Sequence, residues 1–587
     1  MRKHERNNFR IVFSALLACS ALLLFCGQVM AGAHSLILTM PPILAARSHG
    51  SPPPPGSTVT AAQASAFLAR ATFGPKMDEI TALANSGDFN SWLKGQFAAP
   101  PSYHLAWIHQ RLPGIAWKTY CDLVHIAKRD AWWDIVINGN DQLRQRVAFA
   151  LSEIFVTSQF GPLINEPDGL AAYYDILVRD AFGNFRTLLK DVSLSPMMGK
   201  YLSYLGNAKA DPAKGNHPDE NYAREVMQLF TIGLYRLNQD GTTINDPATG
   251  KPLSTYTQDD IREMARVFTG WSDDNGYFEV GGGYNTHHAR TSPMVAFAEY
   301  HDTGAKHVLT TNFPANQSAE QDLDRAVDML FYHPNVGPFI GRQLIQRLVT
   351  SNPSPGYISR VAAAFADNGH GVRGDMKAVI KAILLDPEAL HGADTHPQTF
   401  GKVREPLLGI SHLWRSFHAH NKVCHRRGED DSSPTYTYNC FHFEAARSFL
   451  QQNAAQESLT VFNYFTPDDG PADLKAHNLV SPERMVLGID GLHHIFMSFA
   501  LETYTYDTYE VGAHLDVSVE KNLLDAGKYN ELLERLNILL LAGRMTPEMK
   551  QVLLRFIQEN RNTTEHDFLT RNLIALVMTS AQYAVQR

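Results

Sequence analysis

Five polar side chains recur between residues 220 and 228 with the spacing of one helix face: Glu220, Asn221, Arg224, Glu225 and Gln228. At about 100° per residue they fall within an arc of about 140°, and apolar residues fill the rest of the circle. Two carboxylates beside a guanidinium could supply a general acid and a general base, with Asn221, Arg224 and Gln228 orienting a substrate. The alternative is an ordinary amphipathic helix on which Glu220 and Arg224 form an i,i+4 ion pair facing water.

The second carboxylate of such a site is expected from elsewhere in the chain. Glu220 and Glu225 diverge by about 140° on one helix, so they cannot easily act on the same bond. Asp302 or Glu405 is the candidate partner. Because long irregular segments tend to carry function, we also expect His301 and Asp302 to complete the pocket from a loop.

Three basic-polar segments lie within helical patterns: Arg144–Glu153, Arg342–Arg347 and Lys402–Pro406. Each could form an inter-helix salt bridge, and together they could form a buried polar network. Arg404, in the last segment, is a further candidate substrate-binding residue. We expect Arg404 with Glu405, or His301, to gather with the polar residues of the helix at Glu220.

Metal and nucleophile signatures are absent from the sequence. Histidines cluster in residues 287–307 and again in 418–425, and imidazole suits divalent metals. However, none of the spacings matches a metal motif, so the site is predicted without a metal and its cofactor is left open. There is also no G-x-S-x-G elbow, no dinucleotide fingerprint and no P-loop.

Composition defines the class of protein. The chain has 587 residues, 44% of them hydrophobic and 19% charged, which is enough apolar material for a large core. Its 52 Lys and Arg against 60 Asp and Glu give a net charge of -8. This acidic balance argues against a nucleic-acid partner, whose phosphates require basic surfaces.

Residues 1–33 have the form of a cleaved secretory signal. Arg2, Lys3, Arg6 and Arg10 precede an apolar run from Ile11 to Cys26, and small residues follow at Ala31 and Ala33. The run is shorter than the roughly 20 residues of a membrane span, and no later segment is apolar enough to span. Lipidation at Cys19 or Cys26 is the alternative. We therefore expect a periplasmic or secreted protein without a transmembrane segment in its mature chain.

The remaining cysteines suggest one disulfide. An oxidising compartment permits a bond between Cys424 and Cys440, which would close a short loop, and three cysteines cannot all pair. Cys121 is therefore expected to be free.

The periodicity predicts a mainly α fold with at most a few short strands. A Pro-rich linker at residues 34–57 precedes a large multi-helix domain at 58–587, in one body or two lobes. Thr60 is expected to cap a helix that stops at Gly74-Pro75, and other helices are expected at 141–158, 171–190, 218–234 and 336–349. Irregular insertions are expected at 238–311 and 418–441. Thr435–Tyr438 and Thr503–Thr508 are candidate hairpin or edge strands.

Several segments together resemble a bacterial family known as the domain of unknown function 1800, which consists of large secreted proteins. They are Phe67–Gly74, Leu143–Glu153, Glu220–Gly233, Ala265–Trp271, His301–Lys306, His333–Phe339, Arg373–Asp375, Lys402–Pro406 and Val461–Pro467. The resemblance implies an extracytoplasmic, mostly α-helical protein with no established activity. It also implies a secreted companion from the sulfatase-like family 1501, and it marks the stretch from Glu220 to Glu225 as the family's signature. Residues 418–441 look like a local insertion.

These observations lead to two functional hypotheses. The first is a hydrolase or lyase acting outside the cytoplasm on a polar polymer such as a polysaccharide. Its catalytic residues would be Glu220, Glu225 and Asp302, and its substrate-binding residues Asn221, Arg224, Gln228, His301 and Arg404. The second is a non-catalytic assembly, export or scaffold protein that works with the secreted companion.

Overall fold

Helix α2 (Ala61–Ala71) begins and ends where the sequence predicts. The Thr60 side chain accepts a hydrogen bond from the Gln63 N–H at 3.2 Å, and the Gln63 side chain accepts one from the Thr60 N–H at 2.9 Å. This capping box satisfies two of the free N–H groups at the helix start. The helix ends at Thr72, before Gly74 with φ +128°. The predicted cap and stop are therefore confirmed.

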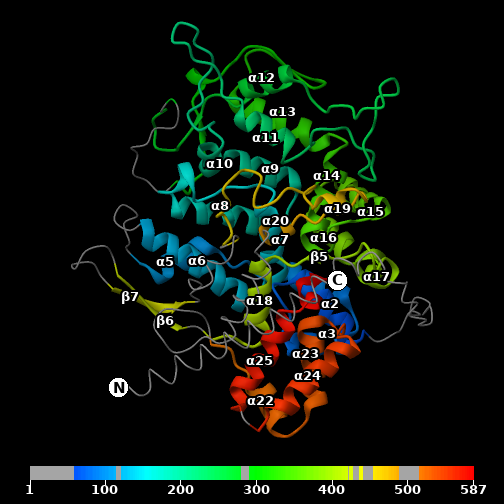
Figure 1. Cartoon of the computed structure of the whole chain (residues 1–587). Coiled ribbons are helices and arrows are strands. Elements are labelled where there is room, and N and C mark those ends of the chain that lie inside the picture. The colour runs from blue at the N-terminus through cyan, green and yellow to red at the C-terminus, as the bar shows by residue number, and fades with distance from the viewer. Residues whose placement is uncertain are drawn as a thin grey trace. The chain divides into compact units, whose positions relative to one another are not determined.

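The computed structural model describes residues 59–113, 121–278, 280, 290–420, 422–427, 435–440, 452, 454–487, 514–562 and 564–587. These residues form mainly α-helices with a few two-stranded sheets (Figure 1), so the predicted fold class is confirmed. The predicted signal peptide, the linker and the strand at Thr503–Thr508 lie outside the described residues. None of the helices described combines the length and apolar character that crossing a membrane requires.

The helices up to residue 267 are α2, α3 (Met77–Ser86), α4 (Phe89–Ala98), α5 (His104–Arg111), α6 (Cys121–Asn138), α7 (Gln142–Ser152), α8 (Pro167–Asp180), α9 (Phe185–Leu194), α10 (Pro196–Tyr201), α11 (Asn221–Gln228) and α12 (Gln258–Val267). Those that follow are α13 (Ala319–Tyr332), α14 (Val336–Leu348), α15 (Pro355–Ala366), α16 (Met376–Leu384), α17 (Pro387–Thr395), α18 (Pro406–Ser416), α19 (Ala472–Lys475), α20 (Arg484–Leu487), α22 (Ser518–Asp525), α23 (Tyr529–Leu541), α24 (Pro547–Asn560), α25 (His566–Met578) and α26 (Ala581–Ala584). Short 3-10 turns are η2 (Gly161–Leu163) and η3 (Ala298–Tyr300).

The single helix predicted at 171–190 is wrong, because the chain breaks there into α8 and α9. Asn184 starts the second helix by accepting a hydrogen bond from the Arg186 N–H at 2.9 Å. The Asn184 Nδ2 also donates to the Arg373 carbonyl oxygen at 2.7 Å, which ties the break to a distant loop. A continuous apolar stripe cannot reveal such a break, because both helices bury the same kind of face.

Within the described part of the chain, the strands form four antiparallel pairs. They are β1 (Trp271–Ser272) with β2 (Val295–Ala296), β3 (Lys306–Val308) with β4 (Thr311–Phe313), β5 (Lys402–Val403) with β8 (Val585–Gln586), and β6 (Lys422–Arg427) with β7 (Thr435–Cys440). The β6–β7 ribbon confirms the hairpin strand predicted at Thr435–Tyr438. Its register pairs Cys424 with Tyr438 and Lys422 with Cys440. The side chains of Cys424, Cys440 and Cys121 lie outside the described part of the structure. The Cys424–Cys440 disulfide therefore stays a prediction.

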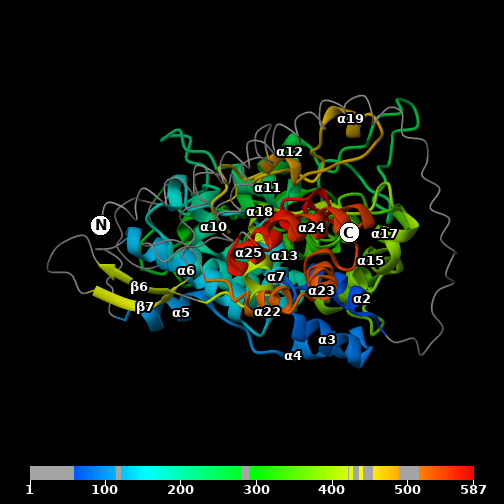
Figure 2. The same cartoon turned by 60° about the horizontal axis from the view of Figure 1, so that its bottom comes forward.

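Residues Thr58–Arg587 form one compact unit. Its first helix contacts the C-terminal group of helices, because the Ser65 hydroxyl of α2 donates to the Ile538 carbonyl oxygen of α23 at 2.6 Å. Figure 2 shows α2 beside α23, with α3 and α4 next to them.

Among the helices whose burial the structure describes in full, α7, α14 and α18 are buried on nearly all sides. Figure 1 shows α7 and α18 in the middle of the cartoon. A helix that is buried all round has no wet face for its polar residues, so each of them needs an internal partner. The charged residues of α7 and α14 are therefore where a polar interior has to form.

Candidate functional site

The predicted polar arc on α11 is largely a surface feature. Glu220 precedes the helix, and its Oε2 accepts hydrogen bonds from Arg224 Nη2 at 3.2 Å and from Gln258 Nε2 at 2.7 Å. The side chains of Glu220 and Arg224 are 35% and 37% exposed, and Asn221 is exposed. This is the i,i+4 pair of an amphipathic helix, facing solvent.

Glu225 and Gln228 point differently from the rest of the arc. Glu225 is buried, and its Oε2 has no hydrogen-bond partner among the described residues. Burial raises the pKa of Glu225, and Arg224 acts against that shift. Gln228 Oε1 accepts a hydrogen bond from the Tyr256 hydroxyl at 2.9 Å, and Gln228 also lines a pocket.

His301 and Asp302 form two structural contacts at another place. His301 Nε2 lies 3.2 Å from Asp322 Oδ2, which also accepts a hydrogen bond from Lys306 Nζ at 2.7 Å. Asp302 accepts two hydrogen bonds from Arg266, from Nε at 2.8 Å and from Nη2 at 3.1 Å. Burial acts to raise the pKa of Asp302, but the Arg266 hydrogen bonds outweigh it and the pKa is lowered. These pairs attach the segment after η3 to α12 and α13.

Arg404 lies in a third place. Its guanidinium stacks on the Tyr583 ring at 4.6 Å, and its Nε donates to the Tyr583 carbonyl oxygen at 3.3 Å. The predicted site residues thus lie in three separate groups: those on α11, the pair His301 and Asp302, and Arg404. Of these residues, Gln228 lines the pocket described next.

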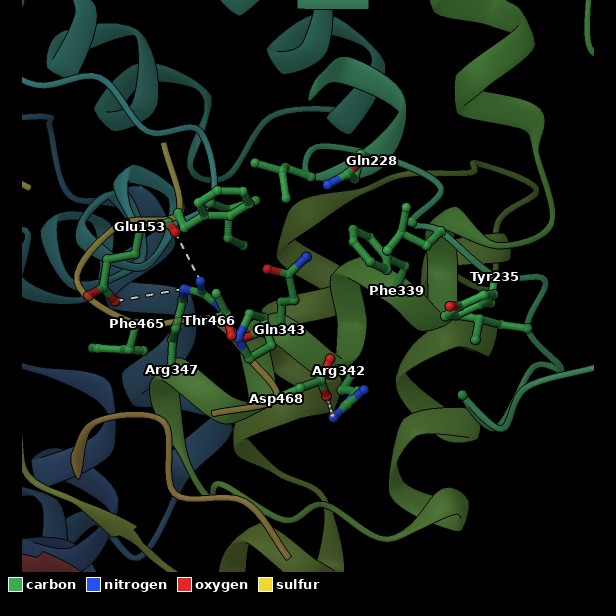
Figure 3. Close-up of a pocket in the computed structure, with 18 of the residues that line it drawn as sticks. Glu153, Gln228, Tyr235, Phe339, Arg342, Gln343, Arg347, Phe465, Thr466 and Asp468 are labelled. Carbon is green, nitrogen blue, oxygen red and sulfur yellow. Dashed lines mark hydrogen bonds and ion pairs between the residues drawn. The ribbon is translucent and has the colours of Figure 1, made fainter. Parts of the chain in front are cut away.

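A pocket of about 440 Å³ lies between the ends of α7 and α11, helix α14 and the loop at 461–468 (Figure 3). Its polar lining comes mainly from Glu153, Gln228, Arg342, Gln343 and Arg347, and apolar rings cover much of the rest. The rings and other apolar side chains of this pocket are Ile154, Leu229, Leu234, Tyr235, Leu237, Phe339, Val461, Phe462 and Phe465. Its size suits a small-molecule or oligomer-unit ligand.

A glycine shapes the pocket wall. Gly233 has φ +70°, and a Cβ at this position would lie 2.7 Å from the ring of Phe339. Only glycine combines this backbone conformation with so close an approach. The turn after α11 is thereby held against α14, which places Gln228 and Phe339 in the same wall.

The inner end of the pocket is an Arg347–Glu153 contact. Arg347 Nη2 donates to the Glu153 carbonyl oxygen at 2.9 Å, and Arg347 Nε lies 3.8 Å from Glu153 Oε2. Asn463 Nδ2 donates to Glu153 Oε1 at 3.2 Å. Figure 3 shows the Arg347 guanidinium between the Glu153 carboxyl group and the side chain of Gln343.

A buried ionic network continues behind Arg347. Lys402 Nζ contacts Glu405 Oε1 at 3.3 Å and Glu483 Oε1 at 3.1 Å, and all three side chains are at most 1% exposed. Gln452 Nε2 donates to Glu405 Oε2 at 2.7 Å. Removing Lys402 would leave two buried carboxyl groups without their cation, which is costly in a low-dielectric interior.

Glu153 and Glu405 are neighbouring buried carboxyl groups whose pKa values shift in opposite directions. Burial raises the pKa of Glu153 well above its usual value, and the nearby Glu405 raises it further. Burial also acts to raise the pKa of Glu405, but Lys402 and Arg146 outweigh it and the pKa is lowered. Like charges this close do not both ionise readily, so the charge of Glu405 favours the protonated form of Glu153.

The network joins the three basic-polar segments identified in the sequence. Arg146 comes from the first, Arg347 from the second, and Lys402 with Glu405 from the third. Sequence reasoning did not find Glu483 and Gln452, because neither lies in a periodic segment. The sequence places Glu153 in the same basic-polar segment as Arg146, but its helical pattern favours Glu220 and Glu225 as the acid and base.

The described residues contain no group of three or more His, Cys, Asp or Glu side chains that could hold a metal ion. The fold and the pocket define a mainly helical protein with a polar, charge-lined site in its interior. A family model described as "Protein of unknown function (DUF1800)" matches residues 66–585. The chain therefore belongs to this family, as its motifs predict. Searches of curated proteins and of solved structures found no match.

Proposed function

We propose that this protein is an exported hydrolase or lyase that acts on a polar polymer, such as a polysaccharide, in the pocket at Glu153. The observation that supports this is a buried carboxyl group with a raised pKa at the inner end of a pocket of about 440 Å³. A carboxyl group whose pKa is raised well above its usual value is suited to general acid catalysis.

The roles follow from the contacts. Glu153 is the proton donor, in place of Glu220 and Glu225, and the ionised Glu405 lies behind it. Arg347 and Gln343 bind polar groups of the substrate, and Phe339 offers a ring on which a sugar could stack.

The carboxyl pair also indicates the type of chemistry. In glycosidases the two carboxylates are about 5–9.5 Å apart on either side of the bond. Glu405 is sealed in the interior and held by Lys402 and Gln452, so it raises the pKa of Glu153 without contacting the substrate. This favours a single proton transfer over double displacement between the two carboxylates.

The test is an assay of the purified mature protein against a panel of polysaccharides, with and without EDTA. We expect cleavage of at least one polymer, loss of that activity in Glu153→Gln, and retention in Glu220→Gln, the matched surface control. A Glu153→Gln protein with full activity would reject the assignment.

A second candidate is a non-catalytic assembly, export or scaffold protein, acting with a sulfatase-like companion. It is favoured by the sealed and mutually paired side chains of Lys402, Glu405 and Glu483. In that case no polymer is cleaved, and Glu153→Gln lowers the secreted yield and the melting temperature.

Export through the signal at residues 1–33 is part of both proposals. We expect the mature N-terminus at Gly32 or His34, after the small residues that end the apolar segment. N-terminal sequencing of the exported protein checks this, and a chain beginning at Met1 or a lipid on Cys19 would contradict it.

A further inference from the structure

Two buried side chains on one face of α14 present unused hydrogen-bond donors at the pocket. Gln343 and Arg347 are four residues apart, so they lie one above the other on the helix. They are 5% and 3% exposed, and both line the pocket. Among the described residues, neither Gln343 Nε2 nor Arg347 Nε has a hydrogen-bond partner.

Buried donors without partners are rare in folded proteins, because each loses its hydrogen bonds to water. Here both atoms are donors, and a guanidinium can only donate. Figure 3 shows the Gln343 side chain next to the Arg347 guanidinium, with Phe339 and Gln228 nearby. The group that would satisfy both is an acceptor with more than one oxygen.

The charge of the surroundings also favours an anion. The network holds three cations, Arg146, Arg347 and Lys402, and three carboxyl groups, Glu153, Glu405 and Glu483. Burial raises the pKa of both Glu153 and Glu483, which favours their neutral forms and weakens the negative side of this network, while it also lowers the pKa of Arg146 and Arg347. A bound anion would restore the balance in an interior where an excess charge is costly.

The remaining walls suit a ring that carries the anion. Phe339, Phe462 and Phe465 give the pocket apolar sides. At the rim, Arg342 pairs with Asp468, and their side chains are 34% and 73% exposed, so this ion pair can rearrange for a longer ligand. An apolar-sided pocket with donors at its inner end fits a sugar ring whose acid group points inward.

We propose that the pocket binds the oxyanion of an acidic saccharide unit, a carboxylate or a sulfate half-ester, between Gln343 Nε2 and the Arg347 guanidinium. The proposal rests on the proposed function for its ligand class, a saccharide. It further specifies that the saccharide carries a negative charge and that Gln343 and Arg347 recognise this charge.

Gln343→Leu separates recognition from stability. Leucine has nearly the same size and removes an amide nitrogen that has no partner, so folding should be unaffected or slightly improved. The same change removes one of the two donors to the oxyanion. Gln551→Leu, at an exposed position on α24, is the matched control.

The experiment is calorimetric titration of the mature protein with glucuronate, glucose 6-sulfate and glucose at low ionic strength. We expect at least one of the two anions to bind tenfold or more tightly than glucose, and Gln343→Leu to weaken that binding at least fivefold. The melting temperature of Gln343→Leu should be unchanged, and Gln551→Leu should bind as the natural protein does. The anion that binds better identifies the acid group.

Equal binding of glucose and both anions, no binding of any probe, or unchanged anion affinity in Gln343→Leu would overturn the proposal. These outcomes are distinct from failure of the proposed function. Anion binding without cleavage of any polymer would reject the enzyme and support the oxyanion site. Cleavage of neutral polymers by a protein that ignores both anions would support the enzyme and reject the site.

Discussion

Lys402 Nζ donates a hydrogen bond of 2.8 Å to the main-chain carbonyl oxygen of Arg347. Arg146 Nη2 donates to the same oxygen at 2.6 Å. Arg347 lies in the last turn of α14, where carbonyl groups have no partner within the helix and the helix dipole is negative. Two buried cations thus stabilise a helix end while a third, the guanidinium of Arg347 itself, faces the pocket.

Replacing Lys402 with methionine should destabilise the protein by about 3–5 kcal/mol. The change removes the cation that lies between Glu405 and Glu483, so two buried carboxyl groups lose their counter-charge. Urea unfolding at neutral pH measures the loss. Lys377→Met, at an exposed position on α16, is the control and should change stability by less than about 0.5 kcal/mol. A Lys402→Met loss below about 1 kcal/mol would contradict the buried network.

The stability of the protein should fall relative to Glu153→Gln as pH rises above the ordinary glutamate pKa of 4.5. The folded protein holds the Glu153 proton in this range while the unfolded chain has released it, so raising the pH favours unfolding. Below pH 4.5 both states are protonated and the two proteins should respond to pH alike. Urea unfolding at a series of pH values measures the difference.

The groups that face Glu153 set this pH effect: Arg347 on α14, Arg146 on α7, Lys402 on β5, Glu405 before α18 and Asn463 in the loop. All of them are present in both proteins, so their own titrations largely cancel in the comparison. A constant difference between wild type and variant from pH 4.5 to pH 8 would contradict a raised pKa of Glu153.

Glu220→Gln should change the free energy of unfolding by less than about 1 kcal/mol. The Glu220–Arg224 pair is about one third exposed, so solvent screens it and the remaining amide can still contact Gln258. Asp322→Asn is the buried comparison, because it removes the counter-charge of the buried Lys306 and should cost several times more. Thermal and urea unfolding of both variants test this, and similar losses would mean that Glu220 has a larger role.

Thiol titration of the exported protein under denaturing, non-reducing conditions should find one free cysteine. The predicted Cys424–Cys440 bond would close a loop of about 16 residues, worth about 3 kcal/mol in the chain-entropy model. Three reactive thiols would contradict the disulfide, and reduction with a thiol reagent provides the reference value.

The sequence predicts the helical class and the starts of α2 and α14 because caps and periodicity are local. It also identifies the polar residues Arg146, Glu153 and Arg347. It does not pair them, since the Arg146–Arg347 hydrogen bond joins residues 201 positions apart. On α11, periodicity places Glu220 and Glu225 on one arc, but it cannot distinguish a solvent-exposed face from a functional site. Burial separates them, and burial depends on helices that lie far away in the sequence.

The pairing of β5 with β8 has a consequence for the order of folding. Gln586 Nε2 donates to the Leu348 carbonyl oxygen at 3.0 Å, across 238 residues, and its strand pairs with Lys402–Val403. Contacts with such long loops form late, because the entropy of closing the loop opposes them. A nascent chain that lacks Gln586 therefore carries the pocket cations without their final support. Such a chain would remain open to proteolysis until translation has delivered this strand.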